Sequence, residues 1–199
     1  SGGGGRFDAG MLYYCPQIWC SDDTDAYERT IIQYGTSYIY PVSSVGSHVS
    51  IVPNHQTGRI TPMSARGVTA MAGSFGFELD LNNISDEDRN TAKEQIKRFR
   101  ELDSLIHNGK YYRLSSPLTD KGAYVAEDRS EVLLHGMIFR TEANMKRYRL
   151  KLSGLDSEAV YKDELSGNEY TGSSLMNGGI LLPQSWGDYF PVEFHLKKI

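Results

Sequence analysis

The sequence predicts an α/β region followed by an all-β region, and three observations carry this prediction. Up to residue 109, short strand-like runs alternate with helical runs, a rhythm typical of βαβ crossovers and a parallel sheet. From Lys110 onward, short runs with period-two alternation are separated by turns that contain Gly, Asn or Asp, as in an antiparallel sheet or sandwich. The first region is less than half of the ~250 residues of a closed (β/α)8 barrel, so we expect the chain to be the C-terminal part of a longer protein.

The chain opens with the run Ser1-Gly2-Gly3-Gly4-Gly5-Arg6. Two interpretations stay open: a flexible linker, or a tight loop whose backbone N–H groups approach a ligand because glycine carries no Cβ. The run has neither the Lys-Ser/Thr pair of a P-loop nor the G-x-G-x-x-G spacing of a dinucleotide site. It therefore does not predict a phosphate cradle. A short helix is predicted next, over residues 7–14.

The stretch 17–29 is the centre of the functional prediction. A strand over 17–21 runs into a helix from about 25 to 38, and the junction holds three aspartates: Asp22, Asp23 and Asp25. The carboxyl ends of strands are where α/β barrels keep their reactive groups. We therefore expect a catalytic carboxylate at this junction.

The three aspartates at this junction have different expected roles. Asp25 and Glu28 match a capping box, which predicts Asp25 as the N-cap of the helix. Period-two alternation of the strand separates the other two, because it puts Ile18, Cys20 and Asp22 on one face and Trp19, Ser21 and Asp23 on the other. One of the adjacent pair can then face a pocket while its neighbour serves the turn. The pattern favours Asp22 over Asp23 by a small margin, and Asp22 is our catalytic candidate.

Two further strand–helix units follow. A second strand is predicted over 45–51, and a loop over 53–58 comes after it. Thr61 before Pro62 is typical of a helix start, with a capping hydroxyl and then proline at the first helical position. That helix is expected to end near Ala72, before a third strand over 75–79. Met63, Met71, Phe75 and Phe77 are interpreted as core residues.

The clearest helix opens at Ser85, because acidic residues fill its first turn, where the helix dipole favours them. Its apolar residues keep a spacing of three or four and are Ala92, Ile96, Phe99, Leu102 and Ile106. Gly109 closes it. We therefore place the domain boundary near 108–113 and assign domains to residues 1–109 and 110–199. Strand-like runs in the second domain include 132–134, 148–152 and 192–196.

Composition excludes several classes of function. The net charge is −4 with both signs mixed along the chain, so no basic stripe predicts nucleic-acid binding. No apolar run reaches the ~18 residues of a membrane span, and no signal peptide opens the chain. The two cysteines, Cys15 and Cys20, do not form a disulfide framework, so we expect a cytoplasmic protein. No metal-ligand spacing and no cofactor motif is found.

For His48, His55 and Trp186 we favour a structural role over ligand binding. His48 and His55 lie at the end of a predicted strand and in the loop after it, where barrel enzymes bind ligands. We nevertheless favour histidines that hydrogen-bond to loop backbone. Trp186 could stack on a sugar, but we favour an aromatic that anchors a turn of the second domain.

A series of motifs follows in order along the first region. They are Ser1 to Tyr14, Pro16-Gln-Ile-Trp-Cys-Ser-Asp-Asp-Thr-Asp-Ala26, Glu28-Arg29, Gln33-Tyr-Gly-Thr36, Tyr40-Pro41, Gly46-Ser-His-Val-Ser50, Val52-Pro-Asn-His-Gln56, Arg66-Gly67 and Phe75-Gly-Phe-Glu-Leu-Asp80. Together these motifs resemble the α-galactosidases of glycoside hydrolase family 36. Over 110–199 the resemblance is one of position and character. It implies the C-terminal part of a (β/α)8 catalytic barrel followed by a small antiparallel β-sandwich domain.

The resemblance also implies an activity and site residues. Family members hydrolyse terminal α-galactosides such as melibiose and raffinose with retention. By resemblance Asp22 is the general acid/base, and Ser1, Gly2 and Gly3 contact sugar hydroxyls. Members often assemble as homo-oligomers, which we expect of the full-length protein.

One departure from the family pattern limits the prediction. The family's nucleophile is an aspartate in a Lys-Trp-Asp setting, and this sequence has no such motif, so we expect the chain alone to be inactive. Two alternatives stay open. One is an α-N-acetylgalactosaminidase or galactosyltransferase of the same family, and the other is a non-catalytic module that binds or assembles through the β domain.

Overall fold

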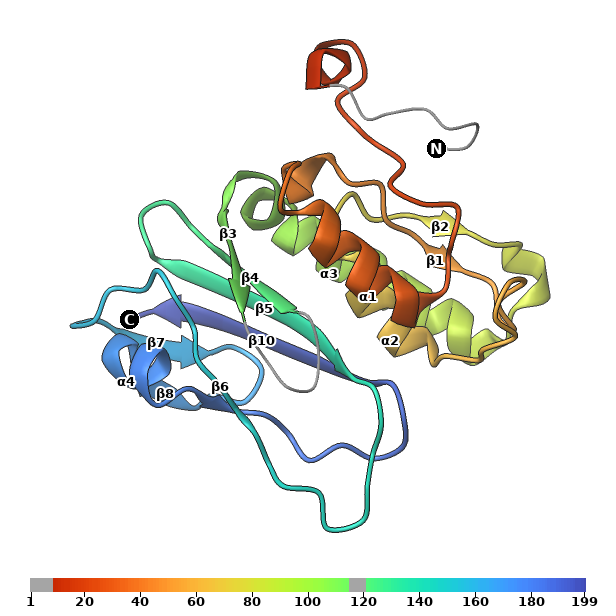
Figure 1. Cartoon of the computed structure of the whole chain (residues 1–199). Helices are drawn as coiled ribbons and strands as arrows, with labels where there is room; N and C mark the ends of the chain where they lie inside the picture. The colour runs from red at the N-terminus through yellow and green to blue at the C-terminus, as the bar shows by residue number, and fades with distance from the viewer. Residues whose placement is uncertain (1–8, 115–120) are drawn as a thin grey trace. The chain divides into compact units, whose positions relative to one another are not determined.

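Figure 1 shows the computed structural model of the chain, which describes residues 9–114 and 121–199. The chain divides into two compact units, Ser1–Asp103 and Ser104–Ile199. No helix in the described ranges has both the length and the apolar character needed to cross a membrane.

The first unit contains three parallel strand segments joined by helices (Figure 1). Ile18 forms a parallel bridge with Val45, and Gly46 forms one with Ser74. β1 (Val49–Ser50) pairs in parallel with β2 (Phe77–Glu78). α1 (Ala26–Thr36) connects the first segment to the second, and α2 (Met63–Ala70) connects the second to the third. This alternation confirms the predicted α/β class and is that of a (β/α)8 barrel segment.

The strands of this unit are shorter than the sequence predicts. The run over 17–21 is reduced to one bridge, in which Ile18 N–H donates to Ser44 O at 2.7 Å and Gly46 N–H donates to Ile18 O at 2.8 Å. Within the described residues this segment pairs on one side alone. Alternation in the sequence reports which residues fit an extended chain, whereas strand length depends on partners on both sides.

Capping explains where the helices begin. Asp25 is the N-cap of α1, as predicted. At α2 the N-cap position falls on Pro62, without a side-chain cap, so the predicted capping role of Thr61 is wrong by one residue. α3 (Asp86–Asn108) begins where predicted, and Ser85 Oγ accepts a hydrogen bond from the Asp88 N–H at 3.0 Å.

The helices cover one face of the parallel strands. Val49 of β1 is fully buried against Met63, Ala70 and Ala92, and Phe75, Phe77 and Leu79 pack beside this cluster. Met63 and Met71 are buried as predicted.

The second unit is built on a six-stranded antiparallel sheet in the order β3-β4-β5-β10-β7-β8. The strands are β3 (Lys110–Leu114), β4 (Lys121–Val125), β5 (Glu131–Ile138), β10 (Phe190–Lys198), β7 (Val160–Asp163) and β8 (Glu169–Thr171). β6 (Arg149–Leu150) and β9 (Ile180–Leu181) form a separate antiparallel pair. The predicted all-β character is confirmed, and one short helix, α4 (Gly172–Asn177), is added to it.

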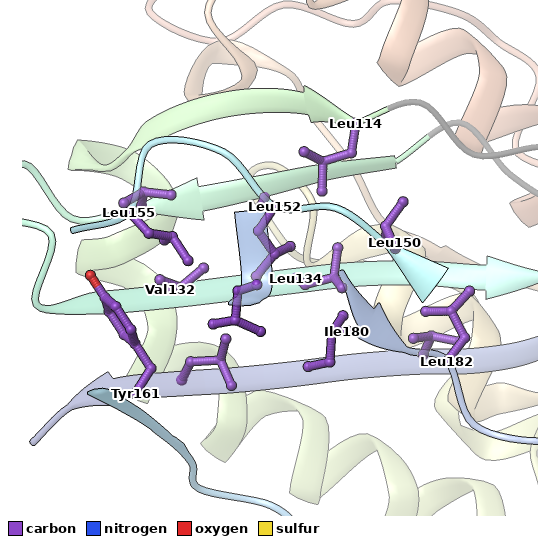
Figure 2. Close-up of a cluster of buried hydrophobic side chains, with 14 of the residues drawn as sticks. Leu114, Val132, Leu134, Leu150, Leu152, Leu155, Tyr161, Ile180 and Leu182 are labelled. Atoms are coloured by element: carbon purple, nitrogen blue, oxygen red, sulfur yellow. The ribbon is translucent and has the colours of Figure 1, made fainter. Parts of the chain in front are cut away.

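The smaller pair packs over the larger sheet and encloses the core. Figure 2 shows Leu150 and Ile180 of the pair in one buried cluster with Val132 and Leu134 of β5, all four at most 1% exposed. Tyr161 lies in the same cluster, and its hydroxyl donates to Arg129 O at 2.8 Å. Two layers around one apolar core are a small β-sandwich.

Candidate active site

Asp22 lies in the bend between the Ile18 bridge and α1, and its side chain is exposed. Trp19 Nε1 donates a hydrogen bond to Asp22 Oδ1 at 3.1 Å. The predicted separation of these two residues onto opposite faces is therefore wrong. Period-two alternation requires an extended chain, and the bend at Asp22 ends it. The result brings the candidate carboxylate onto the side of the strands where Trp19 lies.

Asp23 serves the turn itself. Its Oδ1 accepts the backbone N–H of Asp25 at 2.9 Å, and its own N–H donates to Ser21 Oγ at 3.1 Å. In a capping box the N-cap N–H would bond to Glu28. Here Asp23 takes that place, and Glu28 Oε1 lies 3.8 Å from Arg59 Nη1. Asp22 is thus the exposed member of the adjacent pair, and its side chain takes no part in the hydrogen bonds of Asp23 with Ser21 and Asp25.

Asp25 is buried, and both of its carboxylate oxygens accept hydrogen bonds. Its Oδ1 accepts from the N–H groups of Tyr27 and Glu28 at 2.9 and 3.2 Å, and its Oδ2 accepts from Thr57 Oγ1 at 2.6 Å. Arg59 Nη1 lies 2.5 Å from Oδ1. Burial alone would raise the pKa of Asp25, but the hydrogen bonds from Thr57, Glu28 N–H and Arg59 outweigh it and hold this pKa below its ordinary value. Asp25 is structural.

Trp19, which holds Asp22, is itself stacked on His48. Their ring centroids are 4.5 Å apart with an interplanar angle of 8°. His48 Nε2 lies 2.5 Å from Glu78 Oε2. The favoured interpretation of His48 as a histidine bound to loop backbone is therefore wrong, because its neighbours are side chains from two other strand segments. His55 is exposed in the loop after β1.

Burial favours the neutral form of His48. Burial lowers its pKa, the Glu78 carboxylate opposes this, and the Arg29 guanidinium adds to the lowering. The net pKa lies below the ordinary value of a histidine. A neutral imidazole is consistent with its close stack on the indole of Trp19.

Arg29 of α1 fastens the backbone around the site. Its Nη1 donates to Ser21 O at 3.2 Å, its Nη2 lies 2.5 Å from Gly46 O, and its guanidinium carbon is 5.7 Å from the Trp19 ring centroid. The side chain is buried, and burial lowers its pKa from a very high ordinary value. Removing this cation would free both carbonyls and the residue just before Asp22.

A groove of about 380 Å³ runs along these strand segments, of the size typical of small-ligand sites. Gly46 makes room in it, since a Cβ there would lie 3.3 Å from Trp19 Cε3. Asp22 is held by Trp19, which lines the groove. The lining residues are Gln17, Trp19, Gly46, Ser47, His48, Ser74, Phe75, Gly76, Phe77 and Glu78. An exposed carboxylate beside an aromatic wall can exchange a proton with a polar ligand.

Some predicted site residues lie outside the described part of the chain, and some residues of the site were not predicted. Ser1, Gly2 and Gly3 lie outside the described residues. No sequence pattern predicts Glu78 or Arg59 as a residue of the site. The signal that could have found Glu78 is its place at the end of the third strand, because the carboxyl ends of neighbouring parallel strands meet at one edge of the sheet.

Across residues 9–114 and 121–199, no group of three or more His, Cys, Asp or Glu residues has the geometry to hold a metal ion.

Two family models match the chain. The Melibiase model matches residues 1–109, and the model of the glycosyl hydrolase family 36 C-terminal domain matches residues 120–196. Among curated relatives, the bifunctional alpha-galactosidase/sucrose kinase AgaSK of Mediterraneibacter gnavus is 53% identical, over 100% of this chain and 22% of the relative. Alpha-galactosidase AgaA of Geobacillus stearothermophilus is 45% identical, over 100% of this chain and 28% of the relative.

Solved structures give the same result. The galactosidase domain of AgaSK superposes with a TM-score of 0.95 at 50% identity, over 99% of this chain and 28% of that one. A variant of AgaA from Geobacillus stearothermophilus in complex with raffinose has a TM-score of 0.94 at 43% identity, over 100% of this chain and 28% of that one. The chain thus spans about a quarter of the length of these relatives. With the melibiase model covering more than half of its residues, the chain belongs to glycosyl hydrolase family 36.

Proposed function

We propose that this chain is part of a retaining α-galactosidase that releases terminal α-linked galactose from oligosaccharides, and that Asp22 is its general acid/base. The observation that carries the proposal is the different engagement of the three aspartates. Asp23 is tied to the turn and Asp25 to the helix cap, while Asp22 is exposed beside the groove. The names of the relatives, and the raffinose and stachyose bound to AgaA variants, support this substrate class.

The chemistry has two steps. In the first, a protonated Asp22 gives its proton to the leaving glycosidic oxygen while a second carboxylate attacks the anomeric carbon. In the second, ionised Asp22 takes a proton from water as the water displaces that carboxylate. The galactose leaves with its original anomeric configuration.

The second carboxylate must lie about 5–5.5 Å from the acid/base. Asp23 and Asp25 are committed to backbone N–H groups of the turn and the cap, and neither serves. We assign the nucleophile to another part of the full-length enzyme, so the chain alone is expected to be inactive. We also propose that Ser1, Gly2 and Gly3 bind sugar hydroxyls, and that the enzyme is a cytoplasmic homo-oligomer.

The test is raffinose hydrolysis by the full-length enzyme and its Asp22→Asn and Asp23→Asn variants. Loss of the acid/base is expected to lower kcat/KM by about 10²–10⁴-fold. Asp23→Asn is the matched control, because an amide oxygen can still accept the Asp25 N–H, and it is expected to stay near the wild-type rate. A large loss in Asp23→Asn with little loss in Asp22→Asn would overturn the assignment.

A further inference from the structure

We infer that His48 and Glu78 are positioning residues for Asp22, which they hold through the Trp19 indole. The inference rests on the proposed function and adds to it two residues that act on Asp22 through Trp19. Its basis is a continuous series of contacts in which Glu78 reaches His48, His48 stacks on Trp19, and Trp19 donates to Asp22.

The last contact fixes the carboxylate. Within residues 9–114 and 121–199, the indole N–H of Trp19 is the one hydrogen-bond donor to the side chain of exposed Asp22. Without it, an exposed carboxylate rotates among several rotamers. The direction of the indole N–H therefore decides where Asp22 points.

The stack fixes the indole. An interplanar angle of 8° at 4.5 Å restrains the plane of the Trp19 ring against His48, and a Cβ at Gly46 would crowd the same ring at 3.3 Å. Arg29 approaches the same ring at 5.7 Å. Because Trp19 comes from the first strand segment and His48 from the second, the stack sets the indole relative to the neighbouring strand.

His48 is held at a cost to stability. Its side chain is 7% exposed, and within the described residues neither Nδ1 nor Nε2 has a hydrogen-bond partner. A buried nitrogen without a partner lowers the stability of the fold, because it has lost its hydrogen bonds to water. The Glu78 carboxylate, on the third strand segment, lies 2.5 Å from Nε2 without forming a hydrogen bond, and it is the charged group that approaches this ring nitrogen. Features that oppose stability concentrate at functional sites, which supports a functional role for the imidazole.

The experiment compares two substrates in the full-length enzyme and in its His48→Ala variant. Raffinose has a sugar hydroxyl as its leaving group and needs a proton from Asp22. An aryl α-galactoside with an acidic phenol does not need that proton. We expect kcat/KM for raffinose to fall by about 10- to 100-fold, with a much smaller fall for the aryl substrate. The result is expressed as the raffinose-to-aryl ratio, which is kcat/KM for raffinose divided by kcat/KM for the aryl substrate. A loss of folded enzyme would lower the two kcat/KM values equally and would leave this ratio unchanged.

Three further variants and one control test whether the raffinose-to-aryl ratio depends on these particular contacts. Trp19→Phe removes the N–H but keeps a ring, and it should lower the ratio as His48→Ala does. His48→Phe keeps a face for the indole and should restore most of the ratio. Glu78→Gln changes a side chain that is 62% exposed, so it is expected to fold even where His48→Ala does not, and to lower the ratio by a smaller factor. His135→Ala, which removes a buried histidine beside Glu193 in the second unit, is the control and should leave the ratio unchanged.

The outcomes separate the inference from the proposed function. If Asp22→Asn lowers the raffinose-to-aryl ratio but His48→Ala, Trp19→Phe and Glu78→Gln leave it unchanged, the positioning role is wrong and the acid/base assignment stands. If Asp22→Asn leaves the ratio unchanged, the proposed function itself is wrong.

Discussion

Arg59 Nη1 lies 2.5 Å from Asp25 Oδ1, and this ion pair joins the loop after β1 to the first turn of α1. Thr57 of the same loop donates to the other carboxylate oxygen at 2.6 Å. The Arg59 guanidinium also lies 4.6 Å from the ring centroid of Tyr27. Two loops that follow neighbouring strand segments are thereby fastened together, three residues from the proposed acid/base.

Replacing Asp25 is expected to destabilise the fold. Asp25→Ala removes the N-cap of α1 and leaves Arg59 and Thr57 without their acceptor, so we expect a loss of about 2–4 kcal/mol in the free energy of unfolding. Urea unfolding measures it. The control is Asp86→Ala in the first turn of α3, whose side chain is 93% exposed and whose loss should cost no more than about 0.5 kcal/mol. Equal effects of the two changes would contradict the role given to Asp25.

The buried His48 predicts a pH dependence of stability. Burial lowers its folded pKa, Glu78 opposes the shift and Arg29 adds to it, so the unfolded chain binds this proton more tightly. The stability from neutral His48 is therefore full above the unfolded value of about 6.5 and is lost as pH falls through the lowered folded pKa. We expect His48→Phe to flatten this acid slope in unfolding experiments between pH 7 and 5 (about the histidine range). An unchanged slope would contradict the burial of a neutral imidazole.

Two glycines are expected to respond in opposite directions to alanine. A Cβ at Gly172 would lie 1.9 Å from the backbone oxygen of Asp156, whereas a Cβ at Gly35 would meet nothing within 4 Å. Gly172→Ala forces backbone to move and should cost about 1–3 kcal/mol. Gly35→Ala lies in α1 and should stabilise by about 0.5 kcal/mol through helix propensity. Thermal unfolding of the two variants compares them directly, and a stabilised Gly172→Ala would show that the turn at Asp156 is not rigid.

Local signals predicted where α1 and α3 begin. The start of α3 follows from Ser85 and the acids after it, and the cap of α1 follows from Asp25, because both depend on residues within one turn. The extent of the strands did not follow in the same way. A parallel strand is defined by partners far along the chain, so the run over 17–21 shortened to the Ile18 bridge.

The same contrast between local and long-range contacts decides which parts of the site the sequence predicts. The junction of strand and helix pointed to Asp22, and the turn chemistry of Asp23 and Asp25 follows from sequence neighbours. Trp19, His48 and Glu78 meet because three strand segments lie side by side, and no local pattern contains that contact. The expected turn-anchoring role of Trp186 also failed, since its side chain is 90% exposed.

The most direct test of the central claim is azide rescue of Asp22→Ala in the full-length enzyme, with an aryl α-galactoside as substrate. Without its base the variant accumulates the galactosyl-enzyme, and azide needs no proton removed when it attacks the anomeric carbon and releases the nucleophilic carboxylate. We expect azide to raise the rate and to form α-galactosyl azide, with no such effect on the wild type. A variant that hydrolyses raffinose at a near-normal rate, or that azide does not accelerate, would contradict Asp22 as the acid/base.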